Sequence, residues 1–243
     1  MPLVFSPLSE DILSSPPKRL YPGHAFVMRQ IGNPPPVDLR MAEIVQEVFA
    51  ARNVPTKDAD ASTGGGDFLE RILGLIRATG FTVAIFSHKT RANAMANITL
   101  ELGFAAMCGK PLIIVKSKEA RAPSDFTRTD WVVYDEGNED RFRAKLNQAL
   151  DTIEEAGAFQ DFLLETAMEA KSIDCAVALE RANKAFLLTS DGGLIDKAER
   201  IAERLEGVGE DNSIADLERL RSEVSMFVRQ GRAALAEAGA GAG

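Results

Sequence analysis

The stretch that decides the fold reads Phe81-Thr82-Val83-Ala84-Ile85-Phe86. A nearly continuous apolar run of this length is typical of a central parallel strand that is covered on both faces. A helical pattern follows from about Asn93 to Cys108 and stops at Gly109, and residues 111–115 form a second apolar run. Strand, helix and strand in this order predict a β-α-β unit of a parallel sheet.

The same alternation extends from residue 24 to residue 156. The apolar run 24–28 predicts a first strand, and Arg29 and Gln30 follow at its end. We therefore predict an α/β domain over residues 24–156, with a Rossmann-like parallel sheet flanked by helices. Its remaining expected elements are helices at 38–49, after Asp67 and at 138–156, a short strand or extended link at 54–61 and a strand at 131–134.

Two further regions flank this domain. Residues 1–23 are rich in turn-forming residues and predict an arm. Strand patterns disappear beyond Gly157, so residues 157–243 predict a helical region, interrupted at 190–193 and 207–209. We expect its terminal Ala-Gly repeat to be disordered. Packing against the α/β domain is the first interpretation of apolar positions in its last helix, and self-association or binding of a regulatory protein is the alternative; they are Leu217, Leu220, Val224, Phe227 and Val228.

Composition argues against several classes of function. The net charge of −8 argues against a large nucleic-acid interface, because phosphates require clustered Lys and Arg. No apolar run approaches the roughly 20 residues that span a bilayer, and the N-terminus lacks a secretory signal, so we expect a cytoplasmic protein without a membrane partner. Cys108 and Cys175 have neither disulfide-framework nor zinc-site spacing. We expect no metal and no bound cofactor.

The chemistry-bearing residues of the third helix gather on one face. Asn93, Asn97 and Glu101 are each four residues apart and therefore line one side of the helix over two turns. Glu101 has Leu100, Leu102, Gly103 and Phe104 as neighbours, so it lies in an apolar part of the helix. An unpaired charge there is costly, which favours a glutamate with a partner or a function over one that is simply solvated.

This part of the chain reads Asn97-Ile98-Thr99-Leu100-Glu101-Leu102-Gly103-Phe104-Ala105 and is followed by Gly109-Lys110-Pro111. It resembles the Asn-x-x-x-Glu-Leu-Gly signature of the TIR-like nucleotide-binding proteins and of their relatives, the nucleoside 2-deoxyribosyltransferases. The resemblance covers roughly residues 24–150, with 26–28 as first strand and 123–125 before the last one. It implies that Glu101 is a catalytic residue acting at a ribose C1′.

A carboxylate suits that reaction. Breaking an N-glycosidic bond builds positive charge on the sugar, and an ionised Glu101 would stabilise this charge or attack to form a ribosyl ester. Asn97 would hold the carboxylate or a ribose hydroxyl, or else make a structural hydrogen bond to the adjacent loop. Arg29, Gln30, Ser87 and Asn93 complete the expected substrate site, although Arg29 and Gln30 could equally lie on its rim.

The two families differ in the residue after the central strand. Deoxyribosyltransferases typically place an aspartate there, whereas this chain has Ser87, followed by His88, a candidate acid or a surface residue. A nucleobase generally needs an acid to leave, while nicotinamide leaves NAD⁺ as a neutral molecule. We therefore expect an enzyme that cleaves NAD⁺. The alternatives are a nucleoside or nucleotide N-glycosidase or 2-deoxyribosyltransferase, and a non-catalytic nucleotide sensor.

Related TIR-like enzymes often act as bacterial defence effectors that are switched on by assembly. The resemblance thus implies that the helical region regulates the enzyme or forms an oligomer. A glycine run at 64–66 precedes the second helix and could cradle a phosphate, or be merely a flexible loop.

Overall fold

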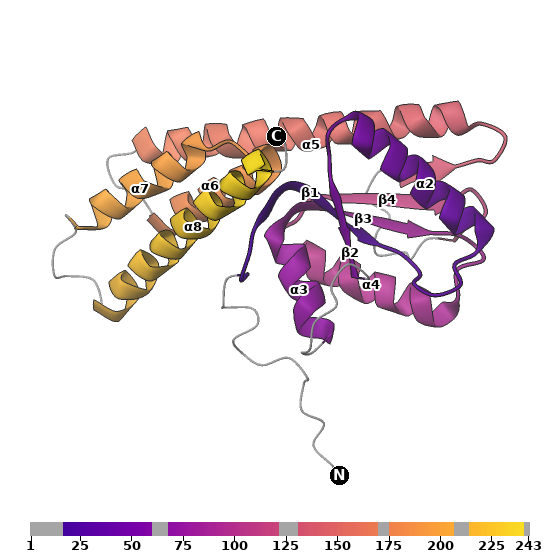
Figure 1. Cartoon of the computed structure of the whole chain (residues 1–243), viewed down its shortest axis with the longest axis horizontal. Coiled ribbons are helices and arrows are strands. Elements are labelled where there is room, and N and C mark those ends of the chain that lie inside the picture. The colour runs from indigo at the N-terminus through magenta and orange to yellow at the C-terminus, as the bar shows by residue number, and fades with distance from the viewer. Residues whose placement is uncertain (1–16, 60–67, 122–130, 170–174, 207–213, 241–243) are drawn as a thin grey trace, which may run out of the picture. The chain divides into compact units, whose positions relative to one another are not determined.

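The computed structural model describes residues 17–59, 68–121, 131–169, 175–206 and 214–240. The strands are β1 (Tyr21–Met28), β2 (Thr56–Asp58), β3 (Thr79–Phe86), β4 (Leu112–Ser117) and β5 (Trp131–Tyr134). The helices are α2 (Pro36–Ala51), α3 (Phe68–Ala78), α4 (Ala92–Met107), α5 (Glu139–Glu169), α6 (Cys175–Thr189), α7 (Gly193–Glu206) and α8 (Ile214–Ala240) (Figure 1).

The five strands form one parallel sheet in the order β2-β1-β3-β4-β5, which confirms the predicted α/β fold. Between β3 and β4 the register pairs Val83 with Ile113 and Ile85 with Val115. The chain runs from β1 outward to β2 and then returns to place β3 on the other side of β1. This reversal of strand order is a topological switch point, and ligands of open α/β sheets bind beside the carboxyl ends of such strands.

The apolar pattern of β3 explains its central position. All eight of its residues are buried, because helices cover both faces of the sheet. Figure 1 shows α2 and the first part of α5 on one face, and α3 and α4 on the other. On the α4 face, Ile98, Leu102 and Ala105 pack into a core with side chains from β1, β3 and β4. This packing fixes which side of α4 remains available for a site.

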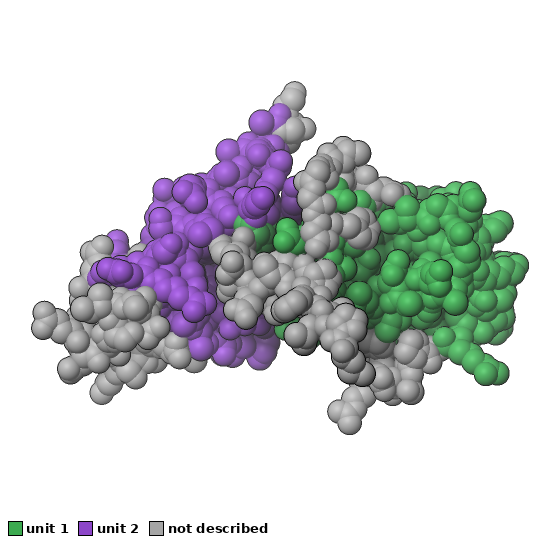
Figure 2. Space-filling view, turned by 90° about the horizontal axis from the view of Figure 1, so that it is seen from below, with its two compact units in different colours: residues 1–17, 24–152 green, residues 18–23, 153–243 purple. Residues whose placement is uncertain are grey.

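The chain divides into two compact units, coloured separately in Figure 2. The α/β unit contains residues 24–152, and the helical unit combines 18–23 with 153–243. Strand β1 begins at Tyr21, inside the segment 1–23 that we expected to be an arm, and residues 1–16 of that arm lie outside the described residues. Leu20 is buried in the core of the helical unit.

The expected end of a helix at Gly157 is wrong. Helix α5 continues through this glycine to Glu169. A Cβ at residue 157 would come within 2.9 Å of Thr189 Cγ2 and 3.3 Å of Leu188 Cβ, so the glycine allows α6 to approach α5 closely. The helix expected to end at Ala156 therefore continues through a glycine that serves helix packing.

The helical unit has a core of its own. Val224 and Phe227 of α8 are buried there, and the rings of Phe186 and Phe227 meet nearly at right angles with centroids 5.7 Å apart. Leu220 and Val228 pack on the same cluster. The expectation that these residues pack against the α/β domain is therefore replaced by packing within the helical unit.

The remaining expectations concern where the helices of this unit begin and end. The predicted interruption at 190–193 is confirmed, since α6 ends at Thr189 and α7 begins at Gly193. The side chain of Leu217, residues 207–209 and residues 241–243 lie outside the described residues. Helix α8 extends to Ala240, into the repeat that we expected to be disordered. Among the described residues, no helix is long and apolar enough to cross a lipid bilayer.

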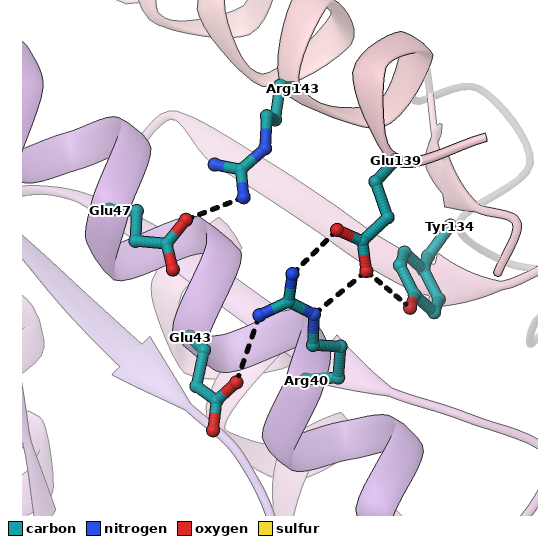
Figure 3. A network of polar contacts seen from close by, with 6 residues as sticks. All are labelled: Arg40, Glu43, Glu47, Tyr134, Glu139 and Arg143. Carbon is teal, nitrogen blue, oxygen red and sulfur yellow. Dashed lines mark hydrogen bonds and ion pairs between the residues drawn. The ribbon is translucent and has the colours of Figure 1, made fainter.

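A polar network joins α2 to α5 and β5 within the α/β unit (Figure 3). The Arg40 guanidinium donates to both carboxylate oxygens of Glu139, with Nε to Oε1 at 2.8 Å and Nη2 to Oε2 at 2.6 Å. The Tyr134 hydroxyl donates to Glu139 Oε1 at 3.2 Å, and Arg40 also donates to Glu43. The hydrogen bonds from Arg40 lower the pKa of Glu139 below its usual range.

We expect Glu139→Gln to lower the thermal midpoint by a few degrees at neutral pH. A carboxylate whose pKa is lowered on folding stabilises the fold above its unfolded pKa, and this contribution is lost as the pH falls. The deficit of the variant should therefore be smaller near about pH 3 than at neutral pH. Glu43→Gln is the matched control, with a smaller effect, because Glu43 makes a single bond to Arg40. An equal deficit for Glu139→Gln at both pH values would contradict this account.

Candidate active site

A pocket of about 470 Å³ opens where β1 ends and α4 begins, beside the topological switch point. Every predicted site residue except Ser87 contributes to its wall. The lining consists of Arg29, Gln30, Ile31, Arg91, Ala92, Asn93, Ala94, Asn97, Ile98 and Glu101. Segments that are far apart in the sequence meet here because β1 and β3 are neighbours in the sheet. The position is the one that α/β folds use for ligands.

Helix α4 supplies the far wall of the pocket. Its apolar stripe, formed by Ile98, Leu102 and Ala105, faces the sheet and is buried. With that stripe fixed, residues at positions 93, 97 and 101 follow one another along the adjoining side of the helix. All three line the pocket, so the predicted row of two amides and a carboxylate is present.

Glu101 is the carboxylate of this pocket. Burial raises its pKa to about 7, because the charged form loses hydration that no nearby group replaces. Among the described residues, none donates a hydrogen bond to its carboxylate and no cation pairs with it. An ordinary surface glutamate would have kept its usual pKa. The carboxylate is thus desolvated and available to a ligand.

The two asparagines are free to contact a ligand as well. Asn93 and Asn97 are both exposed at the pocket wall. Within the described part of the chain, neither side chain makes a hydrogen bond. The structural hydrogen bond to the adjacent loop, considered for Asn97 from the sequence, is therefore not found among these residues.

Gln30 has a positioning role in the structure. Its side chain is 2% exposed, and its Nε2 donates to the carbonyl oxygens of Asn33 at 2.8 Å and Gly32 at 3.4 Å. Its Oε1 accepts a hydrogen bond from the Arg91 backbone N–H at 2.9 Å. The amide thereby connects the loop after β1 to the start of α4. Because these bonds occupy both ends of the amide, Gln30 shapes the pocket wall.

Two guanidinium groups line the pocket. Arg29 pairs with Asp58 of β2, with 3.2 Å between Nη2 and Oδ2. Arg91 donates from Nη2 to the carbonyl oxygens of Gly32 and Asn33. Arg91 was not predicted from the sequence. A basic residue directly before a helix that starts at the carboxyl end of a strand is the signal that could have found it.

Ser87 lies outside the pocket lining. Its side chain is 5% exposed, and its Oγ accepts a hydrogen bond from the Lys89 backbone N–H at 3.0 Å. Its own N–H donates to Thr90 Oγ1 at 2.7 Å, and Thr90 in turn donates to the buried carboxylate of Asp38 at 2.8 Å. Ser87 thus orders the loop between β3 and α4. A short polar side chain right after a strand serves a turn as readily as a ligand, which the sequence alone did not distinguish.

His88 is not part of the pocket lining. Its Nδ1 is 3.2 Å from Ser117 Oγ and 3.6 Å from Glu119 Oε2. Across the described residues, no group of three or more His, Cys, Asp or Glu side chains is placed to hold a metal ion. The glycine run at 64–66 and the segment 123–125 of the family resemblance lie outside the described residues.

Searches against models of known protein families and against curated proteins found no match to this chain. The resemblance to TIR-like proteins therefore rests on the motif around Glu101 and on the α/β fold.

Replacing the desolvated carboxylate should stabilise the protein at high pH. We expect Glu101→Gln to raise the free energy of unfolding by about 1–3 kcal/mol near pH 8, because the wild-type carboxylate must there be buried in its charged form. Near pH 4 the group is protonated in the folded state and largely so in the unfolded state, so the gain should vanish. Denaturant titrations at the two pH values measure this. Glu155→Gln, at an exposed position of α5, is the control and should show no such difference. A lower stability of Glu101→Gln at pH 8 would contradict the assignment of a desolvated carboxylate.

Proposed function

We propose that this protein is an N-glycosidase that cleaves NAD⁺ to nicotinamide and ADP-ribose, with Glu101 as its catalytic carboxylate. The observation that carries the proposal is a single desolvated carboxylate, without a partner among the described residues, in a pocket at the topological switch point of the sheet. Amides and guanidinium groups in the same pocket suit the hydroxyls and phosphates of a nucleotide.

The proposed reaction uses one water molecule. The bond between C1′ of the ribose and the nicotinamide nitrogen breaks, and its electron pair goes to the ring, which leaves as neutral nicotinamide. Ionised Glu101 stabilises the positive charge that develops at C1′, or forms a transient ester with that carbon. Water then adds to C1′ and loses a proton, so the products are nicotinamide, ADP-ribose and H⁺. Asn97 lines the same pocket one helical turn before Glu101, which supports a role in holding a ribose hydroxyl.

The raised pKa of Glu101 is compatible with this role because NAD⁺ is cationic at the scissile bond. A positive nicotinamide ring beside the carboxylate favours its charged form and lowers its pKa in the complex. In the free enzyme, with a pKa of about 7, roughly half of the molecules hold the proton at neutral pH. Substrate binding at that pH would therefore release protons.

The same pKa favours a second candidate function. A glutamate that is protonated at neutral pH can act as a general acid and protonate a departing nucleobase. This observation supports a nucleoside or nucleotide N-glycosidase in which Glu101 is the acid. The two candidates require opposite protonation states of one residue, so the pH dependence of activity separates them.

For NAD⁺ cleavage, we expect kcat/KM to rise with pH through an apparent pKa near 7 and to level off above it. Initial rates of nicotinamide release from pH 5 to pH 9 give this profile. An activity that falls above about pH 7, together with release of free base from nucleosides, would instead favour the general-acid function.

We expect Glu101→Gln to reduce nicotinamide release by about 10²- to 10⁴-fold, since the amide cannot supply the negative charge. Glu155→Gln should retain full activity. Unchanged activity of Glu101→Gln would remove Glu101 from the mechanism. Nucleotide binding with no product over long incubation would point to the non-catalytic sensor.

We also propose that the helical unit controls the enzyme, as in a bacterial defence effector that is switched on by assembly or by a partner protein. The independent core of the helical unit supports a separate regulatory part. Helices α5 and α6 expose Phe159 and Val177, which are apolar positions suited to a contact with another chain.

A further inference from the structure

We propose that Arg91 is the residue that selects substrates carrying a phosphate on the ribose 5′ carbon, so that the pocket accepts nucleotides and discriminates against nucleosides. This inference rests on the proposed function, because it names the substrate class of the same pocket. Its basis is the set of charged side chains in the pocket wall and the partner of each one.

The two guanidinium groups of the pocket differ in how their charge is balanced. Arg29 is compensated by Asp58, and the two side chains are 22% and 25% exposed. Among the described residues, the Arg91 guanidinium donates only to backbone carbonyl oxygens, those of Gly32 and Asn33. Within the described residues, no carboxylate lies within ion-pair distance of Arg91. Among the described residues that line the pocket, Arg91 is therefore the cation without an anionic partner.

The two opposite charges that have no charged partner among the described residues belong to α4 and to the residue that caps its start. Arg91 immediately precedes α4, and Glu101 lies more than two turns further along it. Among the α4 residues of the lining, Glu101 is the only charged one. The pocket therefore carries a negative charge toward one end, from Glu101, and a positive charge at the other, from Arg91.

A nucleotide with a cationic base carries charges that complement this arrangement. Its glycosidic carbon develops positive charge, and its phosphate is negative. A guanidinium group forms charge-assisted hydrogen bonds with phosphate oxygens, which are stronger than those it makes with neutral carbonyl oxygens. Arg29, already paired with Asp58, contributes less net charge. A nucleoside has no group that matches Arg91.

Arg91 also supports the loop after β1, so a loss of ligand binding alone would not prove a phosphate contact. A matched pair of ligands removes this ambiguity. Nicotinamide mononucleotide and nicotinamide riboside share the ring, the sugar and the scissile bond, and differ only in the 5′ phosphate. A damaged loop would weaken the binding of both ligands, whereas a lost phosphate contact would weaken the binding of the mononucleotide alone.

The test is isothermal titration of both ligands into the full-length protein carrying Glu101→Gln, which slows turnover. Three further variants are compared in this background: Arg91→Gln, Arg91→Lys and the control Lys89→Gln. Lys89 is an exposed cation of the same loop that does not line the pocket. The titrations are repeated at low and high salt, because a phosphate contact is weakened by screening.

We expect the mononucleotide to bind about 10- to 100-fold more tightly than the riboside in the Glu101→Gln parent and in Lys89→Gln. Arg91→Gln should reduce this ratio to less than about threefold without changing the affinity for the riboside, and should weaken the salt dependence. Arg91→Lys should retain most of the ratio, because the charge remains. Equal affinities for the two ligands in the parent, an unchanged ratio in Arg91→Gln, or binding of neither ligand would overturn the proposal.

Failure of this inference is distinguishable from failure of the proposed function. Nicotinamide release from NAD⁺ by the unsubstituted protein tests the reaction alone. If nicotinamide is released but the ratio of the two ligand affinities does not depend on Arg91, the hydrolase function is retained and the phosphate assignment is overturned. If no nicotinamide is released but the ratio of the two ligand affinities depends on Arg91, the phosphate site is retained and the hydrolase function is overturned.

Discussion

The candidate site depends on one buried amide, that of Gln30. The loop after β1 and the start of α4 follow two neighbouring strands of the sheet, β1 and β3. The two segments are about 60 residues apart in the sequence. Gln30 connects them by donating to two carbonyl oxygens of the loop and accepting from the Arg91 N–H. Because a buried amide with missing partners would be costly, these bonds specify one arrangement of the two segments. The pocket wall on both sides follows from that arrangement.

The same pocket contains a carboxylate that does not contribute to stability. A glutamate whose pKa is raised to about 7 opposes folding at neutral and higher pH, while the surrounding α4 stripe of Ile98, Leu102 and Ala105 favours it. Proteins commonly accept such a local cost at sites where a reacting group must be desolvated. The apolar neighbours of Glu101 therefore hold α4 in place and also raise the basicity of its carboxylate.

Much of this could be predicted from residue patterns, and the exceptions have physical causes. The continuous apolar run of β3 and the four-residue spacing of Asn93, Asn97 and Glu101 report burial and helical geometry directly. Ser87 and Gln30 were predicted as substrate residues because of their places after strands. Ser87 bonds to the local backbone, and Gln30 bonds both to the local backbone and to the distant Arg91 N–H, and no spacing in the sequence reveals these bonds. Arg91 was missed for the converse reason, since its place in the pocket depends on the packing of α4.

The most direct test of the account is a crystal structure of the Glu101→Gln protein with NAD⁺ bound. The account predicts that C1′ of the nicotinamide ribose lies about 3–3.5 Å from the side chain of residue 101, with the diphosphate toward Arg91. A dinucleotide bound outside the pocket, or one with its adenine-linked ribose beside residue 101 and the nicotinamide in solvent, would contradict it.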